Sequence, residues 1–167
     1  MESALLIAGT VPPPGSSDLD SAASILRFRL RVGTDVQTVD VIEASILRHG
    51  RRYLDRVFTA QEVRACGGYD AEPHLLAPGL AARFSAKEAL LKALRPTTIM
   101  PEWRDVELVS MPGGWLELSL SGAAKAVAEE HNLTDLQVSV SHDGPVAVAT
   151  VVGIERPSPE RLEGRKE

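Results

Sequence analysis

Apolar residues repeat at two different spacings along the chain, and the change between the spacings divides it into strands and helices. Residues 30–36 read as a strand that carries Asp35 near its end, and residues 39–47 repeat at helical spacing until Gly50. Residues 81–94 contain no glycine or proline and consist mostly of strong helix formers. They predict a central helix around which the rest of the chain is organised.

Two further signals lie between these segments. Thr59 and Glu62 stand three residues apart in a capping-box pattern, which predicts the start of a short helix. Pro73 and Pro78 follow in a polar stretch that we interpret as a loop leading into the central helix. That helix is expected to end before Pro96.

Alternation of apolar and polar residues returns after Pro101. Runs with period two flank the turn at Pro112-Gly113-Gly114 and predict a hairpin. A helix is expected to follow from residue 121 or 122 to Asn132, and then two strands over residues 136–141 and 146–152. This order favours an α+β fold with a mostly antiparallel sheet and helices packed on one face.

Two faces of the central helix differ in chemistry. Glu88 and Lys92 stand four residues apart, one turn after Phe84, so a carboxylate and an ammonium meet beside an apolar surface. For an arbitrary pair of this kind, a solvent-exposed ion pair is the common outcome. Another face carries only small residues and should let a second element approach closely: Ala82, Ala86, Ala89 and Ala93.

Composition narrows the class of protein. The 167 residues are 44% hydrophobic and 25% charged, which suits one compact domain. We expect it over residues 29–155, after an N-terminal extension (1–28) and before a polar C-terminal tail (156–167). The net charge of −5 argues against nucleic acid and anionic membrane as partners. The apolar run at residues 4–11 is too short to cross a membrane.

Cysteine usage and one local charge cluster add to this picture. The single cysteine, Cys66, excludes an internal disulfide, and without a Cys/His cluster a zinc site is not expected, which fits the cytoplasm. Residues 47–56 place four arginines beside one aspartate, the only strong basic patch in the chain. The patch is either a well-solvated helix end or a dock for an acidic macromolecule or for phosphates.

Three motifs in this order resemble the holo-acyl carrier protein synthases, the short branch of the 4′-phosphopantetheinyl transferases. They are Gly33-Thr34-Asp35, the run from Arg83 to Ala89 with Lys92 one turn later, and the run from Val138 to Asp143. The resemblance extends over about residues 31–154 and includes Phe58-Thr59 with Glu62 and the stretch 103–107.

The resemblance implies the 4′-phosphopantetheinyl transferase fold with one unit per chain, and a defined reaction. The 4′-phosphopantetheine group would pass from coenzyme A to a serine of an apo acyl carrier protein of fatty acid or polyketide type, releasing 3′,5′-ADP. Asp35 and Glu88 match the ligands of a Mg²⁺ ion, which would neutralise and position the pyrophosphate. Glu88 could also take the serine proton, and Lys92 would stabilise the leaving phosphate.

The resemblance also implies binding residues and partners. Arg83 and Lys87 are assigned to the coenzyme A phosphates, and Ser141 and His142 to coenzyme A held mainly by a neighbouring subunit. A single unit per chain then implies a homotrimer with its sites at the interfaces. The carrier protein is acidic in the family, which assigns it to the basic patch; the docking residues are Arg48, Arg51 and Arg52.

Two other classes remain open on sequence alone. One is a non-catalytic protein of the same fold that binds coenzyme A or the carrier protein without turnover. The other is an unrelated metal-dependent phosphotransferase, although the chain has neither a Walker loop nor a glycine-rich dinucleotide fingerprint. One departure from the family bears on adenine contacts, because Gly113-Gly114-Trp115 stands where the family commonly has a Gly-Lys-Pro turn.

Overall fold

The computed structural model describes residues 28–157, so nearly all of the predicted N-terminal extension and most of the polar tail lie outside the described residues. Five strands form two antiparallel sheets. The larger sheet has the order β1 (Arg29–Thr38), β5 (Val146–Glu155), β4 (Leu133–Asp143), and the smaller one pairs β2 (Val106–Ser110) with β3 (Leu116–Leu120). The predicted α+β class is confirmed, although the strands divide into two sheets.

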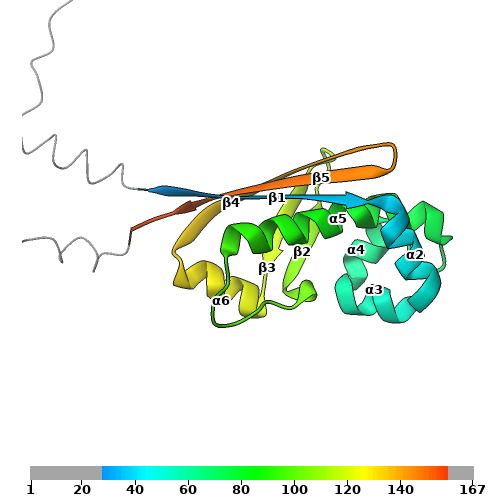
Figure 1. Ribbon diagram of the computed structural model, residues 1–167, viewed down its shortest axis with the longest axis horizontal. Coiled ribbons are helices and arrows are strands. Elements are labelled where there is room, and N and C mark those ends of the chain that lie inside the picture. The colour runs from blue at the N-terminus through cyan, green and yellow to red at the C-terminus, as the bar shows by residue number, and fades with distance from the viewer. Residues whose placement is uncertain (1–27, 158–167) are drawn as a thin grey trace, which may run out of the picture.

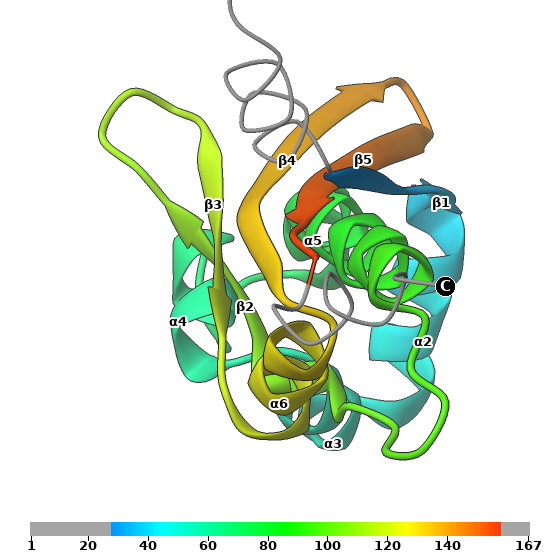
Figure 2. The same cartoon turned by 90° about the vertical axis from the view of Figure 1, so that its left-hand side faces the viewer.

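The longest helix, α5 (Pro73–Leu94), runs along one face of the three-stranded sheet (Figure 1). At one end of α5 lie α2 (Val39–His49), α3 (Arg51–Val57) and α4 (Ala60–Ala65). The β2–β3 hairpin packs on another side of α5 with η1 (Trp103–Asp105) and α6 (Gly122–Glu130), and its tip stands out from the body (Figure 2). The helices therefore lie on one side of the larger sheet, as predicted.

The beginning of α5 differs from the prediction. We expected a loop up to about residue 80, but the helix starts at Pro73 and contains Pro78. Pro73 is tolerated because the first helical residue has no intrahelical use for its N–H. Pro78 removes one helical hydrogen bond, yet this part of α5 stays helical because Leu76, Ala77 and Leu80 are fully buried against the neighbouring helices.

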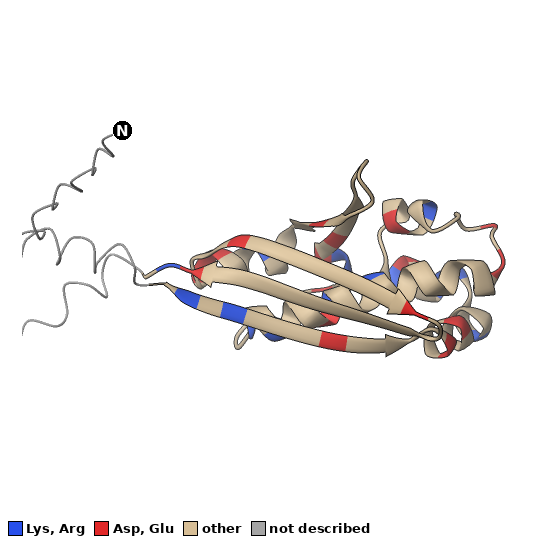
Figure 3. Cartoon of the chain, turned by 90° about the horizontal axis from the view of Figure 1, so that it is seen from above, with Lys and Arg blue, Asp and Glu red and all other residues tan. Residues whose placement is uncertain are grey.

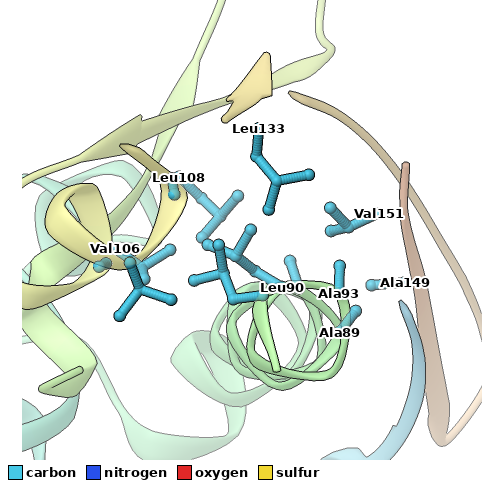
Figure 4. Packing of buried hydrophobic residues seen from close by; sticks show 13 residues of the cluster. Ala89, Leu90, Ala93, Val106, Leu108, Leu133, Ala149 and Val151 are labelled. Carbon is cyan, nitrogen blue, oxygen red and sulfur yellow. The ribbon is translucent and has the colours of Figure 1, made fainter. Parts of the chain in front are cut away.

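Close approach of β1 to α5 depends on small residues, as predicted for the alanine face. A Cβ atom at Gly33 would lie 1.9 Å from the Ala89 carbonyl oxygen and 2.7 Å from the Ala93 nitrogen. Figure 4 shows Ala89 and Ala93 directed toward Ala149 of β5, while Leu90 points to β2. The backbone of β1 therefore rests almost directly on the backbone of α5, and this contact positions Asp35, two residues after Gly33.

On β1 and β5, the opposite face of the three-stranded sheet is largely apolar, and no other described element covers it. Leu30, Val32 and Val36 of β1 are all about half exposed or more, and Val148 of β5 is partly exposed. Val32 pairs with Val152 and Val36 pairs with Val148, so these side chains form an apolar stripe across two strands, with the pair Thr34 and Thr150 between them. Few charged residues lie on the three strands (Figure 3). Among the described residues, no helix has the length and hydrophobicity needed to span a membrane.

Candidate functional site

Asp35 and Lys92 form an ion pair between β1 and α5. The Lys92 Nζ atom lies 2.7 Å from Asp35 Oδ1 and also donates a hydrogen bond to the Thr34 carbonyl oxygen at 2.9 Å. The Asp35 side chain is only 16% exposed, whereas that of Lys92 is 50% exposed. Lys92 therefore provides a positive charge beside the largely buried carboxylate of Asp35.

Glu88 lies one helical turn before Lys92 on the same side of α5. Burial raises the pKa of its carboxyl group, the charge of Asp35 raises it further, and Lys92 acts in the opposite direction. The Asp35 carboxylate is thus close enough to oppose ionisation of Glu88. The structure brings Asp35, Glu88 and Lys92 together from two distant parts of the chain.

The donor set at this site suits a hard cation. Two carboxylates that repel each other across a partly buried site favour a divalent ion between them, and oxygen is the ligand that Mg²⁺ prefers. Within residues 28–157, no group of three or more His, Cys, Asp or Glu side chains could hold a metal. Asp35 and Glu88 could therefore hold Mg²⁺ only with water or phosphate oxygens completing its coordination, which is the usual arrangement for this ion.

Arg83 lies on a different face of α5 from Glu88. Its side chain is buried, and it donates hydrogen bonds to the Gly79 carbonyl oxygen and to Ser110 Oγ at 3.1 and 2.7 Å. Its Nε atom is the one buried side-chain nitrogen or oxygen without a partner in the described part of the chain. The predicted role in binding coenzyme A phosphates does not fit a guanidinium that links α5 to β2 in the interior.

Lys87 is also displaced from its predicted role. Its side chain is completely buried, and Nζ lies 2.8 Å from Glu62 Oε2. The same ammonium donates to the carbonyl oxygens of Trp103 and Val106, so its three protons are all used within the protein. Desolvation lowers the pKa of Lys87 and the charge of Glu62 opposes that shift. We therefore replace the predicted coenzyme A contact with an interior role.

Ser141 and His142 lie at the far edge of the sheet from Asp35. Both residues are exposed near the end of β4, where Ser141 pairs with Val148 and His142 with Ala147. Because β5 separates β4 from β1, and strands are spaced by about 4.8 Å, the axes of β1 and β4 are about 10 Å apart. Within one chain, these two residues do not join the Asp35 site.

The basic patch surrounds the junction of α2 and α3 at Gly50. Arg48, Arg51 and Arg52 are exposed, as a docking role requires. The Arg51 Nε atom lies 3.3 Å from Asp55 Oδ2, and the guanidinium lies over the ring of Tyr69. Part of the positive charge of Arg51 is therefore already balanced within the chain. Arg48 and Arg52 are therefore the stronger candidates for meeting an acidic partner.

Glu62 contributes more contacts to the fold than its capping-box pattern predicts. It was recognised in the capping box, which the structure confirms, since Glu62 N donates to Thr59 Oγ1 and Thr59 N donates to Glu62 Oε2. Its burial and its pairing with Lys87 were not foreseen. The available signal was its place beside Phe58-Thr59 among the residues that resemble the family.

Comparison with known proteins identifies the family of this chain. The family model of the 4′-phosphopantetheinyl transferase superfamily matches residues 31–151, so the chain is a protein of that superfamily. It is 39% identical over 127 residues to a holo-[acyl-carrier-protein] synthase of Rhodopseudomonas palustris, covering 72% of this chain and 91% of the relative. A synthase of the same name from Gloeobacter violaceus is 40% identical over 124 residues, with 74% and 92% covered. Within the superfamily, the chain belongs to the holo-[acyl-carrier-protein] synthases.

Solved structures give the same result. The coenzyme A complex of the Helicobacter pylori holo-[acyl-carrier-protein] synthase has a TM-score of 0.58 and 26% identity, and the match covers 73% of this chain and 98% of that one. The complex of the Chronobacterium ammoniagenes synthase with coenzyme A has a TM-score of 0.64 and 26% identity, covering 78% and 99%. The fold and the family assignment are therefore consistent.

Proposed function

We propose that this chain transfers 4′-phosphopantetheine from coenzyme A to a serine of an apo acyl carrier protein through Asp35, Glu88 and Lys92. The membership of the holo-[acyl-carrier-protein] synthases supports the reaction. The observation that supports these residues is the meeting of Asp35 on β1 with Glu88 and Lys92 on α5. The serine oxygen forms a bond to the β-phosphorus of coenzyme A, the bond to the bridging oxygen breaks, and 3′,5′-ADP leaves.

Glu88 is the acceptor for the serine proton in this proposal. Its raised pKa makes its carboxylate a better proton acceptor than that of an ordinary glutamate. The Lys92 side chain is half exposed and its ammonium donates to Asp35 and to the Thr34 carbonyl oxygen, which leaves a third proton for the leaving phosphate. Proton acceptance and charge neutralisation are thus divided between two residues one turn apart on α5.

Asp35 and Glu88 would hold Mg²⁺ through their carboxylate oxygens. When bound, this ion neutralises the pyrophosphate and orients it for in-line attack. Asp35 is fixed for this purpose by the ladder of β1 with β5, in which it pairs with Ala149. Glu88 is fixed by α5, whose burial along most of its length prevents the helix from turning.

The mass of the carrier protein tests this function directly. An apo acyl carrier protein incubated with coenzyme A and Mg²⁺ should gain one phosphopantetheine group, detected by mass spectrometry, and 3′,5′-ADP should appear in equal amount. A non-catalytic coenzyme A or carrier-binding protein would bind in calorimetry but give no mass gain with any carrier tested. We place this reaction in the cytoplasm, which fits a chain whose only cysteine, Cys66, is unpaired.

A homotrimer is supported by the uncovered face of the larger sheet. Apolar residues on this face would otherwise stay in water at a cost of about 25 cal/mol for each Å², and covering them with another copy removes that cost. In this proposal Ser141 and His142 of one copy contribute to the Asp35 site of a neighbouring copy, because they do not join that site within a single chain. Three sites at three interfaces follow from closed threefold symmetry.

Replacing Val32 with glutamate should break this assembly. Val32 is 49% exposed at the centre of the apolar stripe, so a charge there would be buried only in the trimer and would oppose it. Light scattering should show a shift from trimer to monomer, with transfer activity reduced about tenfold or more because each site loses its neighbour. Ser119→Glu, an exposed position on β3, serves as the control. A Val32→Glu protein that stays trimeric would contradict this interface.

Reversing the charge of Arg48 and Arg52 should weaken carrier protein binding specifically. Both side chains are exposed at the junction that follows β1 and α2, and electrostatic steering acts mainly on the rate of encounter. We expect Arg48→Glu with Arg52→Glu to raise KM for the carrier protein about tenfold or more at low salt, with KM for coenzyme A unchanged. Lys125→Glu on α6 reverses one exposed charge elsewhere. Equal effects on both substrates would reject docking at this patch.

A further inference from the structure

A buried network centred on Glu62 and Lys87 joins four elements of the fold. Glu62 Oε2 accepts hydrogen bonds from Thr59 N and Lys87 Nζ, and Glu62 Oε1 accepts one from Leu108 N. Lys87 Nζ also donates to the carbonyl oxygens of Trp103 and Val106. The network therefore ties α4, α5, η1 and β2 together at one point.

Both ends of the ion pair are completely inaccessible to solvent. The side chains of Glu62 and Lys87 are each 0% exposed, and the Lys87 ammonium lies 5.8 Å from the centre of the Phe58 ring. A buried ion pair is a poor source of stability, because desolvation of the two charges offsets most of their attraction. What such a pair does provide is one defined arrangement of the elements that supply its partners.

Lys87 directly precedes Glu88 in the sequence. The buried network is therefore connected to the candidate site through adjacent residues of α5. Successive residues of an α-helix are turned by about 100° around its axis, so holding Lys87 in the interior directs Glu88 to the side of α5 that meets Asp35. Burial along α5 limits rotation of the helix as a whole, and a restraint at the residue before Glu88 needs directional contacts. The three hydrogen bonds of Lys87 supply that restraint.

We propose that Lys87 and Glu62 are positioning residues, which hold α5 in the rotation that presents Glu88 to Asp35 and to the pyrophosphate. They touch no substrate, because both are enclosed by the protein. This inference rests on the proposed function, since it gives Glu88 the role stated there. It predicts that removing the pair disturbs the carboxylate site while the protein remains folded.

The test compares Lys87→Met with Lys125→Met. Methionine keeps the apolar stem of Lys87 but makes none of its hydrogen bonds, whereas Lys125 belongs to an exposed ion pair with Glu129 on α6 and is the control. We expect Lys87→Met to lower kcat by about tenfold to a hundredfold, as a displacement of about 1 Å does, with KM for coenzyme A within about twofold. The affinity for Mn²⁺, measured by electron paramagnetic resonance, should fall by a similar factor.

A second variant covers the case in which Lys87→Met does not fold. Glu62→Gln keeps the side-chain volume and one acceptor for Leu108 N but removes the charge that Lys87 contacts. It should give the same pattern with a smaller loss of about threefold to tenfold. Circular dichroism and the melting temperature identify the temperature at which each variant is fully folded, and all constants are measured below it.

The outcomes separate this inference from the proposed function. A folded Lys87→Met or Glu62→Gln protein with wild-type kcat and Mn²⁺ affinity, and only a lower melting temperature, would overturn the positioning role. A wild-type protein without transfer activity would instead overturn the proposed function. In that case the Mn²⁺ affinities of wild type and variants still test whether the buried pair positions Glu88.

Discussion

Glu88→Gln should abolish phosphopantetheine transfer while leaving the protein folded. The substitution removes a negative charge and a proton acceptor with almost no change in volume, and Glu88 lies on the partly exposed side of α5, so no buried group loses its partner. A loss of about 10³-fold or more in kcat is expected, since general base and electrostatic contributions are removed together. Transfer is measured by the mass gain of the carrier protein.

Two controls make this result specific. Glu130→Gln changes an exposed glutamate at the end of α6 and should leave transfer unchanged. The pH profile of the wild-type protein is the second. Because burial and Asp35 raise the pKa of Glu88, its active carboxylate is lost on acidification at a higher pH than for an ordinary glutamate, and activity should fall accordingly. Full activity of the Glu88→Gln protein would contradict the proposed role of Glu88 in transfer.

Gly33→Ala should destabilise the protein and strongly reduce transfer, although it adds only one methyl group. The new Cβ would overlap the Ala89 carbonyl oxygen and approach the Ala93 nitrogen, and these backbone atoms of α5 cannot move by a change of rotamer. Overpacking of this kind costs about 1–3 kcal/mol and occasionally more. We expect β1 to move away from α5, with a clear fall in melting temperature and a loss of transfer activity of about a hundredfold.

Gly153→Ala on β5 is the matched control for Gly33→Ala. Its Cβ would meet mainly the ends of the Leu136 and Leu133 side chains, the nearest at 2.7 Å, and these can rotate away. The destabilisation should therefore be smaller and the activity largely kept. If Gly33→Ala were no more harmful than Gly153→Ala in thermal unfolding and in transfer, the direct contact of the two backbones would not be what positions Asp35.

The parts of the fold that follow from local patterns could be predicted from the sequence. Helical spacing and Gly50 defined α2, the capping box defined the start of α4, and the turn at residues 112–114 defined the β2–β3 hairpin. The predicted end of α6 at Asn132 lies two residues beyond the last helical residue, Glu130, and Asn132 has a φ of 48°. Each of these signals lies within a few residues of the feature it predicts.

Features that depend on tertiary packing could not be predicted in this way. Pro78 indicated a loop, but burial of its neighbours outweighs the hydrogen bond that it removes. Lys87 carries a charge that usually faces solvent, and nothing in its sequence neighbours shows that Glu62, 25 positions earlier, would meet it in the interior. The faces of α5 that are covered are decided mainly by β1, β5 and α2, and hence by contacts between distant segments.

The pairing of β1 with β5 affects how the protein can fold during its synthesis. Asp35 lies opposite Ala149 in the ladder, and β1 has no other strand partner among the described residues. As the ribosome extends the chain from its N-terminus, the strand that carries Asp35 emerges early but cannot pair until β5, near the end of the domain, has been synthesised. A messenger RNA truncated shortly before codon 146 would encode all of α5 and the residues Asp35, Glu88 and Lys92. The product would lack β5, the strand that holds Asp35 beside α5.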